Sequence, residues 1–268
     1  MPELPEVETV VRSLAPHLPG RRIVAAEFTS RHVTPGNRAA LARKLAGRMI
    51  HSVARRGKYI LIQLDEGTLT VHLGMTGQLL LDPPPSDHSY GIFHLDTGVL
   101  VYRDPRQFGS ISLLNEGSNA RANKSLAKLG PEPLEIAPAE FAARLKTRKI
   151  RMKALLLDQT FVAGIGNIYA DEILYSAKVH PLAIAARLSK PRVALVHQAM
   201  REVLTLAIEH GGSSISDYVN AAGERGWFQT LHNAYDREGE PCQRCGGIIK
   251  RILVAQRGTH FCPQCQKR

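Results

Sequence analysis

The chain has 268 residues, of which 44% are hydrophobic, and its formal net charge is +11. This length favours two domains with packed cores. The sequence contains neither an apolar run that could span a bilayer nor the basic and apolar start of a secretory signal. The basic excess predicts a polyanionic partner. Nucleic acid is a better candidate than an acidic membrane, because there is no long basic amphipathic helix with bulky apolar anchors.

The first half of the chain predicts a domain rich in strands. Residues 6–18 have the pattern of a short helix, which Pro5 suits because a first helical turn tolerates proline. This helix leaves Pro2 unexplained. From residue 22 to about 114, apolar or alternating runs of strand length are separated by turn signals, with a hairpin around 96–98 and one helix at 38–45. The spacing predicts an antiparallel β-sandwich with flanking helices.

The second half predicts a helical domain, so that the whole chain is of the α+β multidomain class. Residues 115–138 are poor in apolar side chains and rich in Gly and Pro, which predicts a linker. The expected division assigns the first part of this segment to a sandwich domain at 1–125 and leaves a linker at 126–138. A helical domain at 139–236 and a terminal module at 237–268 follow. Within the helical domain, the periodicity predicts helices at 139–147, 152–158, 167–177, 190–210 and 214–221.

All four cysteines lie in the last tenth of the chain, in two C-x2-C pairs separated by sixteen residues: Cys242, Cys245, Cys262 and Cys265. A disulfide-stabilised secreted protein would spread its cysteines through its core. Four thiolates at this spacing suit the tetrahedral preference of Zn²⁺, and the residues between the pairs read as two strands around a turn. The sequence therefore predicts a zinc ribbon with one structural Zn²⁺. A catalytic zinc would need an open coordination position, and the surroundings give no support to a redox pair.

Several basic stretches indicate phosphate binding. Residues 144–153 hold six basic residues and no acid, ARRGK at 54–58 is a second stretch, and residues 249–268 hold five basic residues and no acid. One such run alone is equally well a solvated surface, whereas three together favour salt-dependent binding of nucleic acid. The sequence GIGN places two glycines before a helix that Asn167 would cap. Such a helix start binds anions, although an ordinary helical turn fits the pattern equally.

Six stretches, in order along almost the whole chain, resemble the bacterial formamidopyrimidine-DNA glycosylases (MutM): PELPEVET, RRGKYI, HLGMTG, DPRQFG, GIGNIYADE and the two C-x2-C pairs. The endonuclease VIII-like sister group opens PEGPE, so Leu4 favours the formamidopyrimidine branch. The resemblance implies a β-sandwich, a helix–two-turn–helix domain and a zinc finger, with double-stranded DNA carrying oxidised bases in the cleft between domains. It also implies a monomer in the bacterial cytoplasm, associated with the nucleoid.

The activity implied by this resemblance is excision of 8-oxoguanine and formamidopyrimidines, followed by strand cleavage at the abasic site. Pro2 would be the nucleophile once Met1 is removed, since attack by a secondary amine on C1′ gives an iminium with a fixed positive charge. Glu3 would protonate the sugar ring oxygen, its alternative role being that of a helix-start carboxylate. Glu6 would support the active site or an ordered water.

The resemblance also assigns DNA contacts. Lys58 matches a lysine that contacts the phosphates of the lesion, and Asn167 and Arg257 match the residues that bind the phosphates flanking the flipped nucleotide. Lys153 could approach the base or the backbone, the alternative being that the basic run 144–153 is only a solvated helix face. His72 and Tyr235 are further candidates for phosphate contact. The loop 213–236 would cover the lesion.

Met75, Arg106 and Phe108 match the trio that fills the void left by a flipped base. A flexible apolar Met can replace the base, Phe can wedge a base step, and the Arg fork can bind the widowed cytosine. The alternative is that Met75 and Phe108 are core residues. Two other functions stay open: a sister glycosylase for oxidised pyrimidines, and a non-catalytic zinc-ribbon DNA-binding protein. Pro2 and Glu3 argue against the second function, because a pure binder does not need them.

Overall fold

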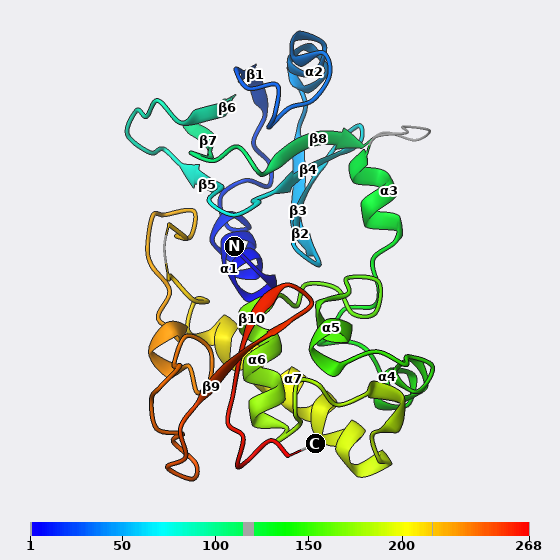
Figure 1. Ribbon diagram of the computed structural model, residues 1–268. Coiled ribbons are helices and arrows are strands. Elements are labelled where there is room, and N and C mark those ends of the chain that lie inside the picture. Colours follow the sequence, from blue (N-terminus) through cyan, green and yellow to red (C-terminus); the bar gives the residue numbers. More distant parts are fainter. Residues whose placement is uncertain (1, 115–120, 216, 268) are drawn as a thin grey trace. The chain divides into compact units, whose positions relative to one another are not determined.

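The computed structural model describes residues 2–114, 121–215 and 217–267, and Figure 1 shows the chain as a ribbon. Contacts divide the chain into two compact units. The first consists of Met1–Lys128 and His210–Trp227, and the second of Leu129–Glu209 and Phe228–Arg268. The structure thus groups residues 210–227 with the strands, whereas the sequence-based division places them in the helical domain.

The first unit is built on two four-stranded antiparallel sheets, as the sequence predicts. Apolar side chains from both sheets, among them Ile62 and Phe93, form one buried core. One sheet has the strand order β1 (Ile23–Phe28), β6 (Ser89–Leu95), β7 (Val99–Arg103) and β5 (Gln78–Leu81). The other has the order β2 (Ile50–Arg56), β3 (Tyr59–Leu64), β4 (Thr68–His72) and β8 (Ser110–Leu114).

Helix α1 (Leu4–Leu14) begins two residues before the predicted start, because Glu3 occupies the N-cap position and its N–H donates to Glu6 Oε2 at 2.8 Å. It ends at Leu14, four residues before the predicted end at residue 18. Helix α2 (Arg38–Leu45) has the predicted bounds, and the Asn37 side chain caps it. A further helix, α3 (Arg121–Ala127), which was not predicted, lies in the segment 115–138. The linker residues 115–120 lie outside the described residues.

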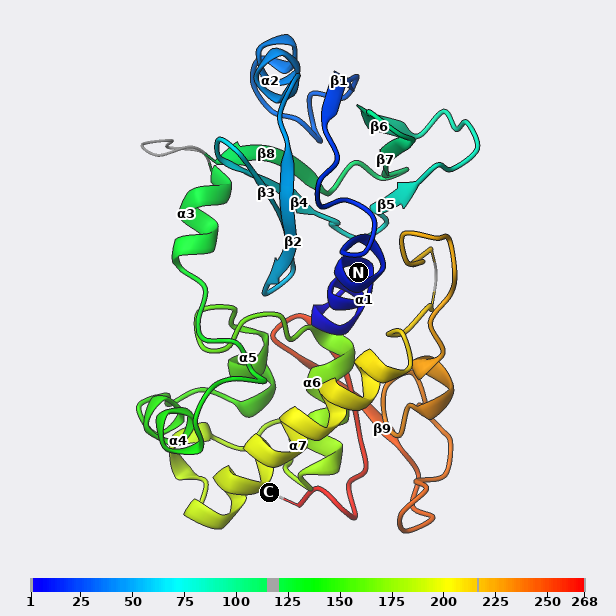
Figure 2. The same ribbon diagram turned by 180° about the vertical axis from the view of Figure 1, so that it is seen from behind.

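The helix predicted at 214–221 is wrong, since the described residues of this range are in bends, a turn or irregular chain. Gly211 and Gly212 have positive φ angles of 72° and 75°, which end the preceding helix. The segment is held by long-range hydrogen bonds instead, and Leu81 N–H donates to Ala221 O at 3.0 Å. Figures 1 and 2 both show the gold segment running beside strand β5.

The second unit is mainly helical, and its four main helices start and end within one residue of the predicted bounds: α4 (Pro138–Lys146), α5 (Met152–Leu157), α6 (Asn167–Ser176) and α7 (Lys190–Glu209). Two short 3-10 turns lie at Ala185–Arg187 and Phe228–Leu231. The predicted hairpin of the terminal module is formed by β9 (Lys250–Val254) and β10 (Arg257–Phe261). Among the helices in the described part of the chain, none has the length and apolar character needed to cross a membrane.

Candidate active site and nucleic-acid-binding surfaces

The start of the chain forms a buried group of polar residues in the first unit. Pro2 and Glu3 precede helix α1 and are both buried, and Glu6 lies one turn further along. Glu6 uses both carboxylate oxygens, since Oε2 accepts Glu3 N–H at 2.8 Å and Oε1 accepts Ser213 N–H at 2.7 Å. A helix-start role explains the first of these bonds but not the second. The expected removal of Met1 concerns a residue outside the described ones.

Residue 212 must be a glycine for Glu6 to hold Ser213 in this way. A Cβ atom on Gly212 would stand 2.7 Å from Glu6 Oε1, and the φ angle of +75° already disfavours other residues. The Tyr218 hydroxyl adds a further link, since it lies 3.2 Å from Glu6 O and 3.1 Å from Gly211 O and its one hydrogen can be donated to or shared between them. The first half of the predicted lesion loop is therefore fixed to the N-terminal helix. The second half, 228–236, belongs to the other unit.

Lys58 and His72 lie close to each other at one end of the strand pair β3–β4. Lys58 sits in the turn before β3 and is mostly buried, and the next residue, Tyr59, pairs with His72 across β3 and β4. His72 Nδ1 accepts the N–H of Gly74 at 3.1 Å, which leaves the proton on Nε2. Burial, followed by the positive charge of Lys58, lowers the pKa of His72 to about 4. His72 is therefore a neutral N–H donor near a cation at neutral pH.

Two loops of the first unit carry the residues predicted to fill a void in DNA. Met75 lies between β4 and β5 and is 38% exposed, and Phe108 lies between β7 and β8 and is 59% exposed. The Arg106 guanidinium lies over the Phe108 ring, 4.7 Å from its centroid. The exposure of Met75 and Phe108 argues against the core alternative. Each of the two loops thus presents a large apolar side chain to solvent.

Asn167 connects the start of helix α6 to the zinc hairpin in the second unit. Gly166 is the N-cap, so the prediction that Asn167 itself caps the helix is wrong by one residue. Asn167 Nδ2 donates to Gly258 O at 3.1 Å, next to the exposed Arg257. The side-chain oxygen of Asn167 is buried and has no partner among the described residues. A buried polar atom without a partner is uncommon and is consistent with a site completed by a ligand.

Lys153 is fully buried in the second unit, at 0% exposure. Its Nζ lies 2.6 Å from Asp171 Oδ1 and donates to Asn167 O at 2.8 Å. The other Asp171 oxygen accepts the backbone N–H of His260 at 2.9 Å and faces His260 Nδ1 at 3.2 Å. The ammonium group of Lys153 is thus directed at helix α6, which supports a role within the helical domain better than a direct contact with DNA.

Asp171 and His260 were missed by the sequence analysis, although Asp171 stands in the quoted GIGNIYADE stretch. The His260 ring also packs at 5.3 Å from the ring of Tyr235. Tyr235 is held through its backbone N–H, which donates to Glu172 Oε1 at 2.8 Å. These contacts place Tyr235 beside the hairpin that carries Arg257.

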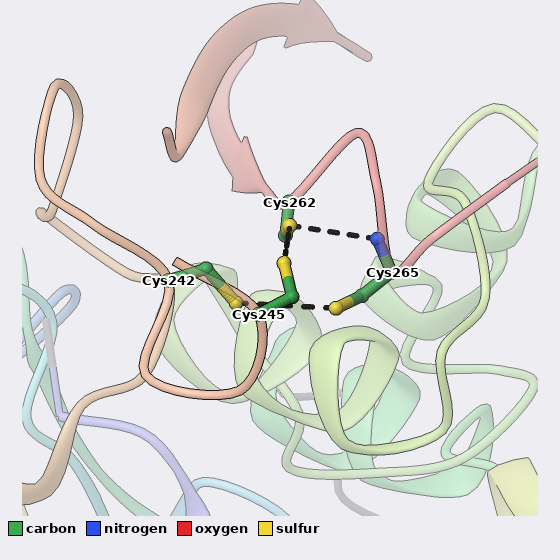
Figure 3. A group of neighbouring side chains, drawn as sticks. All are labelled: Cys242, Cys245, Cys262 and Cys265. Carbon is green, nitrogen blue, oxygen red and sulfur yellow. Dashed lines mark hydrogen bonds between the residues drawn. The ribbon is translucent and has the colours of Figure 1, made fainter. Parts of the chain in front are cut away.

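The four cysteine side chains converge at one end of the hairpin in the second unit (Figure 3). Their sulfur atoms all lie within 4.8 Å of one another, and the Cys245–Cys262 and Cys242–Cys265 sulfur pairs are 3.5 Å and 4.0 Å apart. Thiolates bound to one tetrahedral Zn²⁺ lie about 3.8 Å from each other, so the group fits this ion. The donor set consists of thiols alone and forms one structural zinc site.

The thiol of Cys242 is prepared for metal binding by its neighbours. Burial raises its pKa, but hydrogen bonds, first of all from the Tyr175 hydroxyl at 3.2 Å, lower the pKa to about 6. Burial and the other three thiols raise the pKa of Cys265 to about 12. A bound cation would favour the thiolate form of all four residues.

Three family models cover the chain in order. They are described as the formamidopyrimidine-DNA glycosylase N-terminal domain, matching residues 1–111, the formamidopyrimidine-DNA glycosylase H2TH domain, matching 129–219, and a zinc finger found in FPG and IleRS, matching 239–268. The chain belongs to the formamidopyrimidine-DNA glycosylase family. It is therefore an enzyme, a DNA glycosylase of base excision repair, and lyase activity is typical of this family.

Full-length relatives of this glycosylase carry the same family name. The formamidopyrimidine-DNA glycosylase of Solibacter usitatus (strain Ellin6076) is 52% identical over 270 residues, covering 100% of both chains. That of Roseiflexus sp. (strain RS-1) is 46% identical over 277 residues, again with 100% of both covered. A crystal structure of a Lactococcus lactis FPG mutant with DNA containing Fapy-dG matches with a TM-score of 0.91 at 38% identity, covering 100% of both chains. A Lactococcus lactis Fpg complex with abasic-site DNA matches with a TM-score of 0.90 at 38% identity, covering 99% of this chain and 100% of that one.

Proposed function

We propose that this glycosylase excises oxidised purines, 8-oxoguanine and formamidopyrimidines, from double-stranded DNA and then cleaves the strand by β,δ-elimination. The observation that carries the proposal is the buried group at the start of the chain, in which Glu6 holds both Glu3 N–H and Ser213 N–H. The Glu6 carboxylate thus joins the Pro2–Glu3 pair to the loop that starts at Ser213, which is proposed to cover the base. The relatives support the substrate class, since two solved complexes contain Fapy-dG or abasic-site DNA.

Pro2 is the proposed nucleophile after removal of Met1. α-Amino groups have a pKa of about 8, well below that of lysine, so a useful fraction is free base at neutral pH. The nitrogen lone pair of Pro2 forms a bond to C1′. The bond from C1′ to the base breaks, and the base leaves with the electron pair and takes a proton from water. No cofactor is required, because the amine itself becomes the electron sink.

Glu3 is the proposed proton carrier. Its carboxylate takes the proton from the attacking nitrogen and passes it to O4′ as the C1′–O4′ bond opens, which leaves an iminium between C1′ and Pro2. The positive charge acidifies the C2′ hydrogens, and loss of one of them expels the 3′ phosphate. Loss of a C4′ proton from the conjugated product then expels the 5′ phosphate. Water hydrolyses the iminium and releases Pro2.

The basic residues have proposed roles at the phosphates. Lys58 binds the phosphate of the lesion and assists elimination, with neutral His72 as a nearby N–H donor. In the second unit, Arg257 and the side-chain NH₂ of Asn167 bind phosphates. Tyr235 lies beside the same hairpin and is a further candidate. Met75, Arg106 and Phe108 enter the duplex in place of the flipped nucleotide. We also propose that the enzyme acts as a monomer in the bacterial cytoplasm, at the nucleoid.

The test is covalent trapping. The mature protein is incubated with a duplex containing 8-oxoguanine opposite cytosine, or with one containing an oxidised pyrimidine, and borohydride is added to reduce the iminium. The expected result is a covalent adduct with the first duplex that is lost when Met1 is retained and strongly reduced in Pro2→Gly, whose primary amine is a poorer substitute for the secondary amine. The matched control is Pro5→Ala, which changes the other proline of the buried helix start and should keep the adduct.

The outcomes separate the candidate functions. An adduct formed with the oxidised-pyrimidine duplex alone would support the sister activity and contradict the proposed substrate class. The absence of an adduct with every oxidised duplex would contradict the catalytic role of Pro2. Peptide mapping of the adduct to a residue other than Pro2 would contradict the proposed nucleophile while keeping the lyase reaction.

A further inference from the structure

A buried carboxylate lies between the two loops that carry Met75 and Phe108. Asp104 is 0% exposed and begins the loop between β7 and β8. Its Oδ1 accepts the Thr76 hydroxyl at 2.6 Å, and its Oδ2 accepts Gly109 N–H at 2.8 Å and the Tyr102 hydroxyl at 3.2 Å. The described residues give this carboxylate three neutral donors and no cationic partner. A buried anion in such surroundings is costly unless its hydrogen bonds are complete.

The donors come from both loops. Thr76 follows Met75 directly on the loop between β4 and β5, and Gly109 follows Phe108 directly on the loop between β7 and β8. One carboxylate therefore fixes the neighbour of each exposed apolar residue. Burial, and next the charge of Asp104, raise the pKa of Tyr102 above its ordinary range, so its hydroxyl keeps the proton that it donates.

Close packing of the two loops explains the glycines of HLGMTG and DPRQFG. A Cβ atom on Gly74 would stand 2.5 Å from Gly109 N, and one on Gly77 would stand 2.5 Å from the Tyr102 hydroxyl oxygen. A Cβ atom on Gly109 would stand 1.8 Å from the same oxygen. Side chains at these positions would force the loops apart. The hydroxyl–carboxylate cluster and the glycines thus serve the same contact.

The loop that carries Arg106 and Phe108 is also held from its other side. Gln107 has a φ angle of +54°, and its side chain accepts the Ser30 hydroxyl at 2.6 Å and donates to the Tyr90 hydroxyl at 3.2 Å. Its backbone N–H donates to Asp104 O at 2.9 Å. Arg106 and Phe108 flank this fixed residue and point outward, in cation–π contact with each other. The exposed side chains are therefore carried by a rigid backbone.

We infer that Asp104 is a positioning residue, which together with Thr76 and Tyr102 joins the two loops into one platform that presents Met75, Arg106 and Phe108 at a fixed spacing. The inference rests on the proposed function, because the entry of this trio into DNA is itself proposed. A trio fixed before binding does not have to be ordered when the base leaves the stack. Asp104 acts through the loops and does not touch the DNA.

The test uses Thr76→Val, which removes one hydroxyl at nearly constant volume and breaks the bond between the loops. Asp104→Asn is the second variant. Both should slow excision of 8-oxoguanine from a duplex by about 10- to 100-fold, because misplacement of the trio impairs base extrusion. Borohydride trapping on a single-stranded abasic oligonucleotide, which has no void and no widowed base, should stay within about twofold of wild type.

The matched control is Thr70→Val. Thr70 lies on strand β4 and is buried like Thr76. Its hydroxyl donates to Ser112 O at 3.0 Å, so it does not join the two loops. It should lose a similar amount of stability in denaturant unfolding and keep duplex excision. A double variant with Phe108→Ala gives a second readout. Thr76→Val should have little further effect in that background if it acts through the trio.

The outcomes distinguish this inference from the proposed function. Equal losses on the duplex and on the single-stranded oligonucleotide would overturn the positioning role, as would equal effects of Thr76→Val with and without Phe108. Unchanged duplex excision in both variants would overturn it as well. If wild-type protein neither excises 8-oxoguanine nor forms an adduct, the proposed function itself fails.

Discussion

The side chain of Glu6 accepts the backbone N–H of Ser213 at 2.7 Å, although the two residues are 207 positions apart in the chain. Its other oxygen accepts Glu3 N–H at 2.8 Å. One buried carboxylate thus couples the proposed proton carrier to the loop proposed to cover the base. A glutamine at this position has one acceptor oxygen and one NH₂ donor, so it can satisfy only one of these two N–H groups.

Glu6→Gln should therefore release either Glu3 or Ser213. We expect excision of 8-oxoguanine from a duplex to fall by about 10- to 100-fold, because the lesion loop and the active site lose their fixed relation. Cleavage of a preformed abasic site, which has no base to hold, should fall less. The measurement is single-turnover kinetics on the two substrates.

The control for this prediction is Glu8→Gln on the same helix. Glu8 binds Arg12 at 2.8 Å and Arg55 at 2.9 Å, and it contacts neither Glu3 nor Ser213. It should lower stability without changing the ratio of the two rates. Equal losses on both substrates in Glu6→Gln would contradict the coupling and leave only a structural role for Glu6.

Removal of the metal should act on the hairpin that carries Arg257. A chelator is expected to release one Zn²⁺ per chain, measured with a metallochromic dye, and to weaken DNA binding, because the four thiols no longer hold the hairpin. Arg257→Ala should lower the slope of log K against log salt by about one unit. Removal of zinc from the Arg257→Ala variant should weaken DNA binding little further. Unchanged DNA affinity after complete zinc release would contradict the role of the hairpin.

Local patterns in the sequence predicted much of the fold. Helix α2 has the predicted bounds because its cap, Asn37, lies next to it in the sequence. The metal site was predicted because each C-x2-C pair brings two sulfur atoms together within one short turn. The helix expected at 214–221 is wrong because the backbone of this segment bonds to a distant strand, where Leu81 N–H donates to Ala221 O at 3.0 Å. Periodicity within a segment contains no information about a partner so far away in the chain.

The roles of charged residues were harder to predict for the same reason. Lys153 ends a basic run that suggests a DNA-binding surface, yet its ammonium is paired with Asp171 in the interior. Asp104 stands in a quoted motif, but its three donors come together only when the loops pack. Sequence patterns show that a residue is charged, whereas its partners are set by the tertiary structure.

The stability of the first unit should depend on pH through His72. The ordinary pKa of histidine is about 6.5, and that of His72 in the folded protein is lowered to about 4. Between these values the unfolded chain binds a proton that the folded chain does not, so the free energy of unfolding rises with pH. Above pH 6.5, His72 is neutral in both states and the free energy of unfolding no longer changes through it. As the pH falls from 6.5 to 4, the free energy of unfolding falls by up to about 3 kcal/mol through His72.

Denaturant unfolding at several pH values between 4.5 and 7.5 tests this prediction. His72→Gln should remove this part of the pH dependence. Lys58→Met removes the nearby positive charge, so it should raise the folded pKa of His72 and narrow the pH range over which stability changes. Lys128→Met changes an exposed lysine of the same unit and should leave that pH range unchanged. A pH dependence that is identical in wild type and His72→Gln would show that this side chain does not cause it.

Asp171 should be essential to the stability of the second unit. Asp171→Asn removes the negative charge that lies 2.6 Å from the fully buried Lys153 ammonium, and breaking a buried pair in this way costs about 3–5 kcal/mol. The double variant Lys153→Met, Asp171→Asn removes both charges and should recover part of this loss. Glu140→Gln, which breaks the exposed pair with Arg144 at 3.8 Å, is the control and should cost less than about 1 kcal/mol. Equal stability of Asp171→Asn and the double variant in urea unfolding would show that the buried charge of Lys153 is not the source of the loss.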